Sequence, residues 1–79
     1  MSHVPHELRE EFPEFTDVIH KLKEDSAHFR RLAEEYHAVN RSIHRLETGD
    51  EHMSQFDEEN LRKERLRLKD ELYALLKDA

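Results

Sequence analysis

The 79-residue sequence contains no cysteine, a single glycine and only two prolines. The absence of cysteine excludes a disulfide-stapled secreted module, a cysteine-ligated zinc finger, an iron–sulfur protein and a redox-active thiol protein. Because Gly49 stands alone, a glycine-rich phosphate-binding loop is excluded as well. No apolar run approaches the roughly 20 residues of a membrane-spanning helix, and no secretory signal is visible. We expect one soluble cytoplasmic domain over residues 1–79.

Apolar residues recur at a fixed spacing, although charged residues make up 41% of the chain. One row repeats every seven residues without a gap, and a second row beside it is interrupted after Ile19, at Asp25 or Ser26. The uninterrupted row is Leu8, Phe15, Leu22, Phe29, Tyr36 and Ile43. A period of about 3.5 residues is typical of a helix packed along one seam. At the interruption we expect a local shift of this seam.

Start and stop signals divide the chain into helices. Pro5 and Pro13 each suit the first turn of a helix. Gly49 suits a left-handed helix stop, and Ser54 followed by Asp57 resembles a capping box. The predicted elements are a short helix over about 5–11, a long helix over about 14–47, a turn at about 48–53 and a last helix over about 55–78. The fold class is therefore all-α, an antiparallel two-helix hairpin resembling a coiled coil, with a short N-terminal helix.

The two long helices can be aligned by pairing residues whose numbers add to about 101. Leu32 then meets Leu68, and opposite charges also face each other across the hairpin. The predicted ion pairs include Glu35 with Arg65, Glu34 with Arg67, and Arg30 with Glu71. Such pairs favour one orientation and one alignment of the helices.

The first long helix is longer than its partner, so residues before about Lys21 extend beyond the hairpin. This overhang is apolar, and either the 5–11 helix folds back over it or a second copy covers it. Because a two-helix unit has a one-sided core, we expect a homodimer or higher oligomer. The predicted partner or oligomer face consists of Leu8, Phe12, Phe15, Ile19, Leu22, Leu66 and Tyr73. For Leu66 and Tyr73, the alternative is that they are scattered apolar residues on the surface and do not form a contact face.

Seven histidines are the most unusual feature of the composition. His20 and His28 share a helix face, but eight residues separate them by roughly 12 Å along the axis, too far to hold one ion. His3 with a free amino terminus offers a copper or nickel site. We expect solvated histidines and no physiological metal site. A thin hairpin also offers no cavity of the usual size of about 300 Å³. The sequence therefore predicts no enzyme, no cofactor and no small-molecule substrate.

A basic stretch at residues 62–69 suggests nucleic-acid binding as an alternative function. Against it stand the net charge of −6 and residues 47–59, which carry six acids and no lysine or arginine. Duplex binding usually requires a continuous basic face. Salt bridges within the protein are therefore the favoured interpretation of this stretch. Binding to membrane surfaces is disfavoured by the same acidic balance.

Several segments resemble, in order and spacing, the YdcH family of small bacterial proteins. These segments are Glu11-Phe12-Pro13-Glu14-Phe15, Ile19-His20-Lys21-Leu22-Lys23, His28-Phe29 with Glu35-Tyr36, Ile43-His44-Arg45-Leu46-Glu47, and Lys63-Glu64-Arg65-Leu66-Arg67-Leu68-Lys69-Asp70-Glu71-Leu72-Tyr73. The resemblance implies a short helical hairpin in the bacterial cytosol. It implies no reaction and supplies no catalytic or ligand-binding residues, because the family's function is uncharacterised.

The sequence thus favours a small helical adaptor or assembly protein that acts through protein–protein contact. In this hypothesis the overhanging strip of Phe12, Phe15, Ile19 and Leu22 is presented to another helix. An equally open alternative is that the strip only closes a homodimer. The alternative hypothesis, from another functional class, is a nucleic-acid-associated regulator that binds through residues 62–69.

Overall fold

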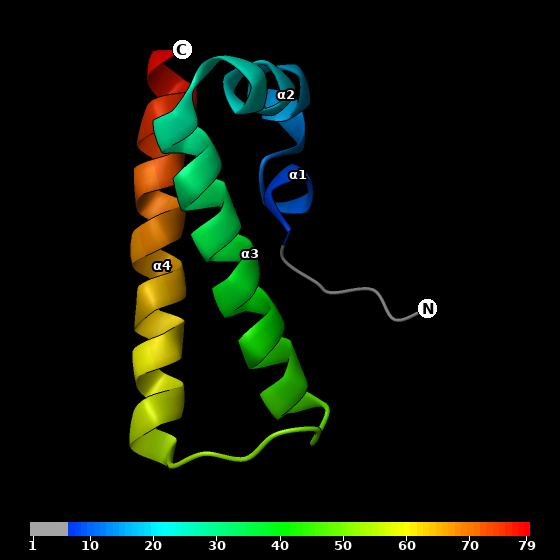
Figure 1. Ribbon diagram of the computed structural model, residues 1–79, viewed down its shortest axis with the longest axis vertical. Coiled ribbons are helices and arrows are strands. Elements are labelled where there is room, and N and C mark those ends of the chain that lie inside the picture. Colours follow the sequence, from blue (N-terminus) through cyan, green and yellow to red (C-terminus); the bar gives the residue numbers. More distant parts are fainter. Residues whose placement is uncertain (1–6) are drawn as a thin grey trace.

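The computed structural model describes residues 7–79, and every regular element in that range is helical (Figure 1). The elements in chain order are α1 (Leu8–Glu11), the short 3₁₀ helix η1 (Pro13–Phe15), α2 (Thr16–Asp25), α3 (Ala27–Glu47) and α4 (Gln55–Asp78). The prediction of an all-helical fold is confirmed. The expected start of the first helix at Pro5 lies outside the described residues. Within the described range, no helix is both long enough and apolar enough to cross a bilayer.

Helices α3 and α4 run in opposite directions and make the most extensive helix contact in the fold (Figure 1). The apolar side chains at the centre of the core are almost fully buried, among them Phe29, Tyr36, Leu68, Leu72 and Leu76. They occur at the turn-by-turn spacing that places side chains on one face of a helix. Burial of this shared face supplies the main apolar contribution to stability.

A polar contact crosses the same interface. Asn40 is only 1% exposed, and its Oδ1 accepts a hydrogen bond from Nη1 of Arg65 at 3.2 Å. The predicted partner of Arg65 was Glu35, and the predicted partner of Arg67 was Glu34. Arg65 instead contacts Asn40, five residues after Glu35 in α3, while Arg67 forms ion pairs within α4. Exposed arginines form ion pairs with carboxylates three or four residues away on their own helix more readily than with carboxylates on another helix.

The connection between α3 and α4 contains the predicted stop and start signals. Gly49 has a φ of 84°, in the left-handed region that favours glycine. Its N–H donates to the carbonyl of Leu46 at 3.2 Å. Oγ of Ser54 then accepts a hydrogen bond from the N–H of Asp57 at 3.1 Å, which caps α4. Both signals are confirmed.

The prediction of one continuous helix over 14–47 is wrong. The chain leaves the helical conformation at Ser26, whose φ of −126° and ψ of 112° are extended. Oγ of Ser26 accepts a hydrogen bond from the N–H of Phe29 at 3.1 Å, so Ser26 caps α3. Residues 13–15 also form a 3₁₀ turn instead of the start of an α-helix. The interruption in the second apolar row thus marks a break between two helices.

The break lets residues 7–25, here called the N-terminal arm, fold back over α3 and α4 (Figure 1). Leu8, Phe12 and Ile19 of the arm are between 5% and 8% exposed and join the core. Of the two ways to cover the apolar overhang, the structure therefore shows the intramolecular one. The expectation that the overhang extends beyond the hairpin is wrong, because the turn at Ser26 returns it to the same chain.

Candidate functional site

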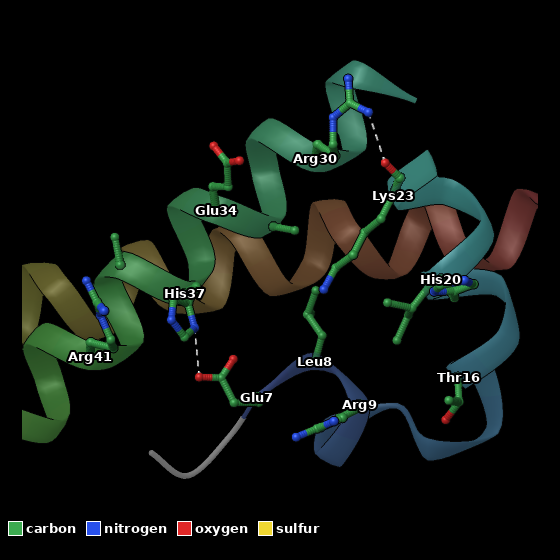
Figure 2. Close-up of a pocket in the computed structure, with 13 residues that line it drawn as sticks. Glu7, Leu8, Arg9, Thr16, His20, Lys23, Arg30, Glu34, His37 and Arg41 are labelled. Atoms are coloured by element: carbon green, nitrogen blue, oxygen red, sulfur yellow. Dashed lines mark hydrogen bonds and ion pairs between the residues drawn. The ribbon is translucent and has the colours of Figure 1, made fainter. Parts of the chain in front are cut away.

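A groove of about 960 Å³ lies between the N-terminal arm and α3 (Figure 2). The sequence predicted that so small a protein has no cavity of useful size, and this prediction is wrong. The arm folds back without closing completely on α3, and the space between their side chains remains partly open to solvent. The groove could not be foreseen from helix periodicity because it depends on where the arm is placed.

The floor of the groove is apolar. Leu8 and Ile19 supply it from the arm, and Ala33 and Ala38 supply it from α3. These alanines are small and lie among the longer side chains that α3 also contributes to the groove, which are Arg30, Glu34, His37 and Arg41. A surface of this kind can accept a large apolar side chain from outside.

The rim of the groove carries more positive than negative charge. Its cationic residues are Arg9, Lys23, Arg30 and Arg41, and its carboxylates are Glu7 and Glu34. Figure 2 shows that these side chains come from both walls, with Arg9 and Lys23 on the arm and Arg41 on α3. Apart from half-buried Glu7 they are exposed, and they are spread around the opening instead of converging on one point. This arrangement suits an extended acidic partner better than a single small anion.

Two polar contacts hold the walls of the groove in position (Figure 2). Nδ1 of His37 lies 2.8 Å from Oε1 of Glu7 and joins α3 to the arm. Nη1 of Arg30 donates to the backbone carbonyl of Lys23 at 3.1 Å, across the break at Ser26. The arm is therefore fastened to α3 at both ends of the groove.

On its other side, the arm is anchored to α4 by aromatic contacts. The rings of Phe12 and Tyr73 stack with centroids 5.6 Å apart, and Phe15 meets Tyr73 edge-on at 6.1 Å. Nζ of Lys69 lies 2.8 Å from Oε1 of Glu11 and 5.8 Å from the centre of the Phe12 ring. Aromatic stacking and cation–π contact add to the apolar burial. These contacts make the arm a fixed wall of the groove.

The structure divides the predicted partner face into buried and exposed residues. Leu8, Phe12 and Ile19 are buried in the chain's own core, and Phe15 and Leu22 are partly buried against it. Leu66 is 60% exposed and Tyr73 is 43% exposed. The seven residues therefore do not form one exposed face in this structure. Whether Leu66 contacts a second copy stays a prediction.

The sequence analysis missed two exposed apolar residues near the connection between α3 and α4. Phe56 is 71% exposed and Met53 is 37% exposed. Both lie within residues 47–59, here called the acidic segment, which carries six acids and no lysine or arginine. Met53 precedes α4, and Phe56 lies in its first turn outside the buried row of Leu68, Leu72 and Leu76. These positions could have identified both residues as exposed.

The basic stretch at residues 62–69 is extensively paired within the chain. Arg67 hydrogen bonds to Glu64 and, at 2.8 Å, to Glu71. The hydrogen bond from Arg67 lowers the pKa of Glu64, and the same contact raises the pKa of Arg67. Nη1 of Arg62 lies 3.7 Å from Oε2 of Glu58. These contacts agree with the salt-bridge interpretation of the stretch.

The histidines of the described range are dispersed. Nε2 of His20 lies 3.2 Å from Oε1 of Glu24, and His37 contacts Glu7. Across residues 7–79, no three histidine, aspartate or glutamate side chains gather in a way that could hold a metal ion. His3, which was considered for a copper or nickel site in the sequence and not favoured, lies outside the described residues.

Comparison with known proteins supports the family resemblance. Residues 29–76, which cover most of α3 and most of α4, match a family described as "Protein of unknown function (DUF465)". The chain is also 31% identical over 65 residues to the "Uncharacterized protein YdcH" of Escherichia coli (strain K12) and to that of Shigella flexneri. Each alignment covers 82% of this chain and 88% of the relative. No solved structure matches the chain. None of these names mentions a reaction.

Proposed function

Because the chain belongs to the DUF465 family, whose function is unknown, we propose its function from its geometry: it is a protein-interaction module without catalytic activity. In this proposal the groove between the N-terminal arm and α3 receives an acidic amphipathic segment of a partner protein. The observation that supports it is the combination of an apolar floor and a mainly cationic rim in one groove of about 960 Å³.

The two parts of the groove have different roles in binding. Contact with exposed Ala38 and with the small exposed parts of Leu8, Ile19 and Ala33 buries apolar surface, which contributes to the affinity. The charges of Arg9 and Arg41 attract acidic segments and disfavour basic ones, which supplies selectivity and faster association. A helix with apolar residues on one face and carboxylates on the other satisfies both requirements.

The side chains that line the groove offer little for catalysis. Thr16 supplies its one hydroxyl group, and Oγ1 of Thr16 donates to the carbonyl of Pro13 at 2.8 Å. Neither histidine of the groove is buried, and His37 is engaged by Glu7. The lining therefore supports a role in binding. A cytoplasmic location remains a prediction of the sequence.

The proposal is tested with a fluorescently labelled synthetic helix that carries glutamates on one face and leucines with one phenylalanine on the other. We expect saturable binding in fluorescence anisotropy. Replacing both rim arginines, Arg9→Glu with Arg41→Glu, should weaken binding at least about tenfold, because two attractive contacts become repulsive. Arg31→Glu with Lys63→Glu is the control matched in net charge, since both residues are exposed and neither lines the groove.

Two results would contradict the proposal. One is the absence of saturable binding to the wild-type protein. The other is equal weakening by the rim variant and by the control with the same net charge, Arg31→Glu with Lys63→Glu, which would show a response to net charge alone. A second probe helix with lysines in place of the glutamates checks that the sign of the charge matters.

A further inference from the structure

We infer that the partner segment received by the groove is the acidic segment of a second copy of this chain. This inference rests on the proposed function of the groove and names its occupant. The acidic segment carries the charge opposite to that of the rim, and it carries exposed apolar side chains that suit the floor. The two surfaces are complementary in both respects.

The charge complementarity is local, because the chain as a whole has a net charge of −6. Two of the acids in the segment are already paired internally. Glu51 contacts Arg45 at 2.7 Å, and Glu58 contacts Arg62 at 3.7 Å. The remaining acids, such as Glu59, supply the attraction toward the cationic rim.

Phe56 is the apolar group best placed to enter the groove. Its side chain is 71% exposed, the highest value among the exposed large apolar residues of the described chain. It lies in the first turn of α4, where Ser54 caps the helix through the N–H of Asp57. The backbone that presents Phe56 is therefore already ordered, and binding costs less conformational entropy than the ordering of a flexible loop. The alanines on the floor leave room for an aromatic ring.

No residue of the acidic segment lines the groove of its own copy. Figure 1 shows the arm on one side of α3, whereas α4 begins on the other side, at the end of α3 away from α2. Phe56 lies at that beginning of α4. The segment can fill a groove only when it belongs to another copy. This contact differs from the oligomer face predicted from the sequence, which included Leu66 but not Phe56.

Sedimentation velocity over a series of concentrations measures the self-association of the full chain. Phe56→Ser should weaken association at least about tenfold, because an aromatic anchor in a pocket dominates such contacts. Leu66→Ser is the matched control, since it removes a similarly exposed apolar side chain from α4, outside the acidic segment. We expect the control to change association less than about twofold. A larger effect of Leu66→Ser than of Phe56→Ser would overturn the inference.

A mixing experiment tests which surfaces meet. Arg41→Glu damages the groove but leaves the acidic segment intact, whereas Phe56→Ser damages the segment but leaves the groove intact. Each variant alone should associate weakly. Their equimolar mixture should associate more strongly than either, because the intact segment of one can enter the intact groove of the other. If the mixture associates no better than the separate variants, the inference is wrong.

These experiments also separate the inference from the proposed function. A wild-type chain that stays monomeric at every concentration, yet binds the acidic probe helix, overturns the inference and leaves the groove's proposed function standing. Self-association without probe binding contradicts the proposed function and the inference that depends on it. Both altered side chains are exposed, and circular dichroism checks that each variant keeps its helical content.

Discussion

Phe12 and Tyr73 stack with ring centroids 5.6 Å apart and planes inclined by 23°. They join the N-terminal arm to the last helix and thus connect segments near the two ends of the described chain (Figure 1). This contact keeps the arm over the α3–α4 pair. It also maintains the groove, because the arm forms one of the groove's walls.

Removal of the Tyr73 ring should destabilise the protein. We expect Tyr73→Ala to lower the free energy of unfolding by about 1–3 kcal/mol, because the rings of Phe12 and Phe15 both lose an aromatic neighbour. Urea denaturation followed by circular dichroism measures the change. Leu66→Ala, an exposed substitution on the same helix, should stay within about 0.5 kcal/mol of wild type. Equal losses in both variants would contradict this account of the Phe12–Tyr73 contact.

The cap at Ser26 gives a second prediction. Ser26→Ala removes the acceptor for the N–H of Phe29 and should cost about 1 kcal/mol of stability. Ser26→Asp keeps an acceptor at this position and should be close to wild type. Thermal unfolding of the three proteins makes the comparison. If Ser26→Ala is as stable as wild type, the hydrogen bond does not secure the break between α2 and α3.

The buried Tyr36 predicts a loss of stability at high pH. Burial, assisted by the negative charge of Glu11, raises the pKa of Tyr36 to about 12 from an ordinary value of 10.0. The folded state therefore holds the proton more tightly than the unfolded state. This contribution is fully present below pH 10.0 and is lost as the pH rises toward about 12. Urea denaturation across this interval should show a smaller decline for Tyr36→Phe than for wild type. An identical decline in both proteins would contradict the prediction.

The hydrogen bond between Arg65 and Asn40 predicts a cost for an apolar replacement. Arg65→Met keeps much of the side-chain stem but removes the charged donor to Oδ1 of Asn40. We expect the free energy of unfolding to fall by about 1–3 kcal/mol. Asn40 is buried, so the hydrogen bond to its amide oxygen lies in a site shielded from water. The double variant Arg65→Met with Asn40→Leu should recover part of this loss. If the second substitution adds its full cost independently, the two residues are not coupled.

The sequence predicted best the parts of the fold that depend on local signals. The left-handed conformation of Gly49 and the cap at Ser54 are each determined by a few neighbouring residues. The apolar rows likewise identified the buried faces of α3 and α4, because a helix places every third or fourth residue on one side.

The break at Ser26 was missed because the main apolar row continues across it. Leu22 and Phe29 keep the seven-residue spacing, although one lies in α2 and the other in α3. The serine hydroxyl was a capping signal at this position, but periodicity alone favours a continuous helix. The interruption of the second apolar row at Asp25 and Ser26 was the feature of the sequence that indicated the break.

The groove was beyond prediction from the sequence for a different reason. Its walls include Arg9, from the beginning of the described chain, and Arg41, from the second half of α3. The separation of these walls follows from the angle between the arm and α3, which no local spacing specifies. The cross-helix ion pairs failed similarly, because exposed side chains such as Arg67 have nearby alternatives on their own helix.

The return of the arm at Ser26 has a consequence for the order in which the protein assembles. Helices α3 and α4 are joined by a short connection at residues 48–54, so their encounter closes a small loop. The contact of Phe12 with Tyr73 joins residues 61 positions apart and has to close a far larger one. We therefore expect α3 and α4 to pair first and the arm to dock afterwards, so that the groove is completed at the last step of folding.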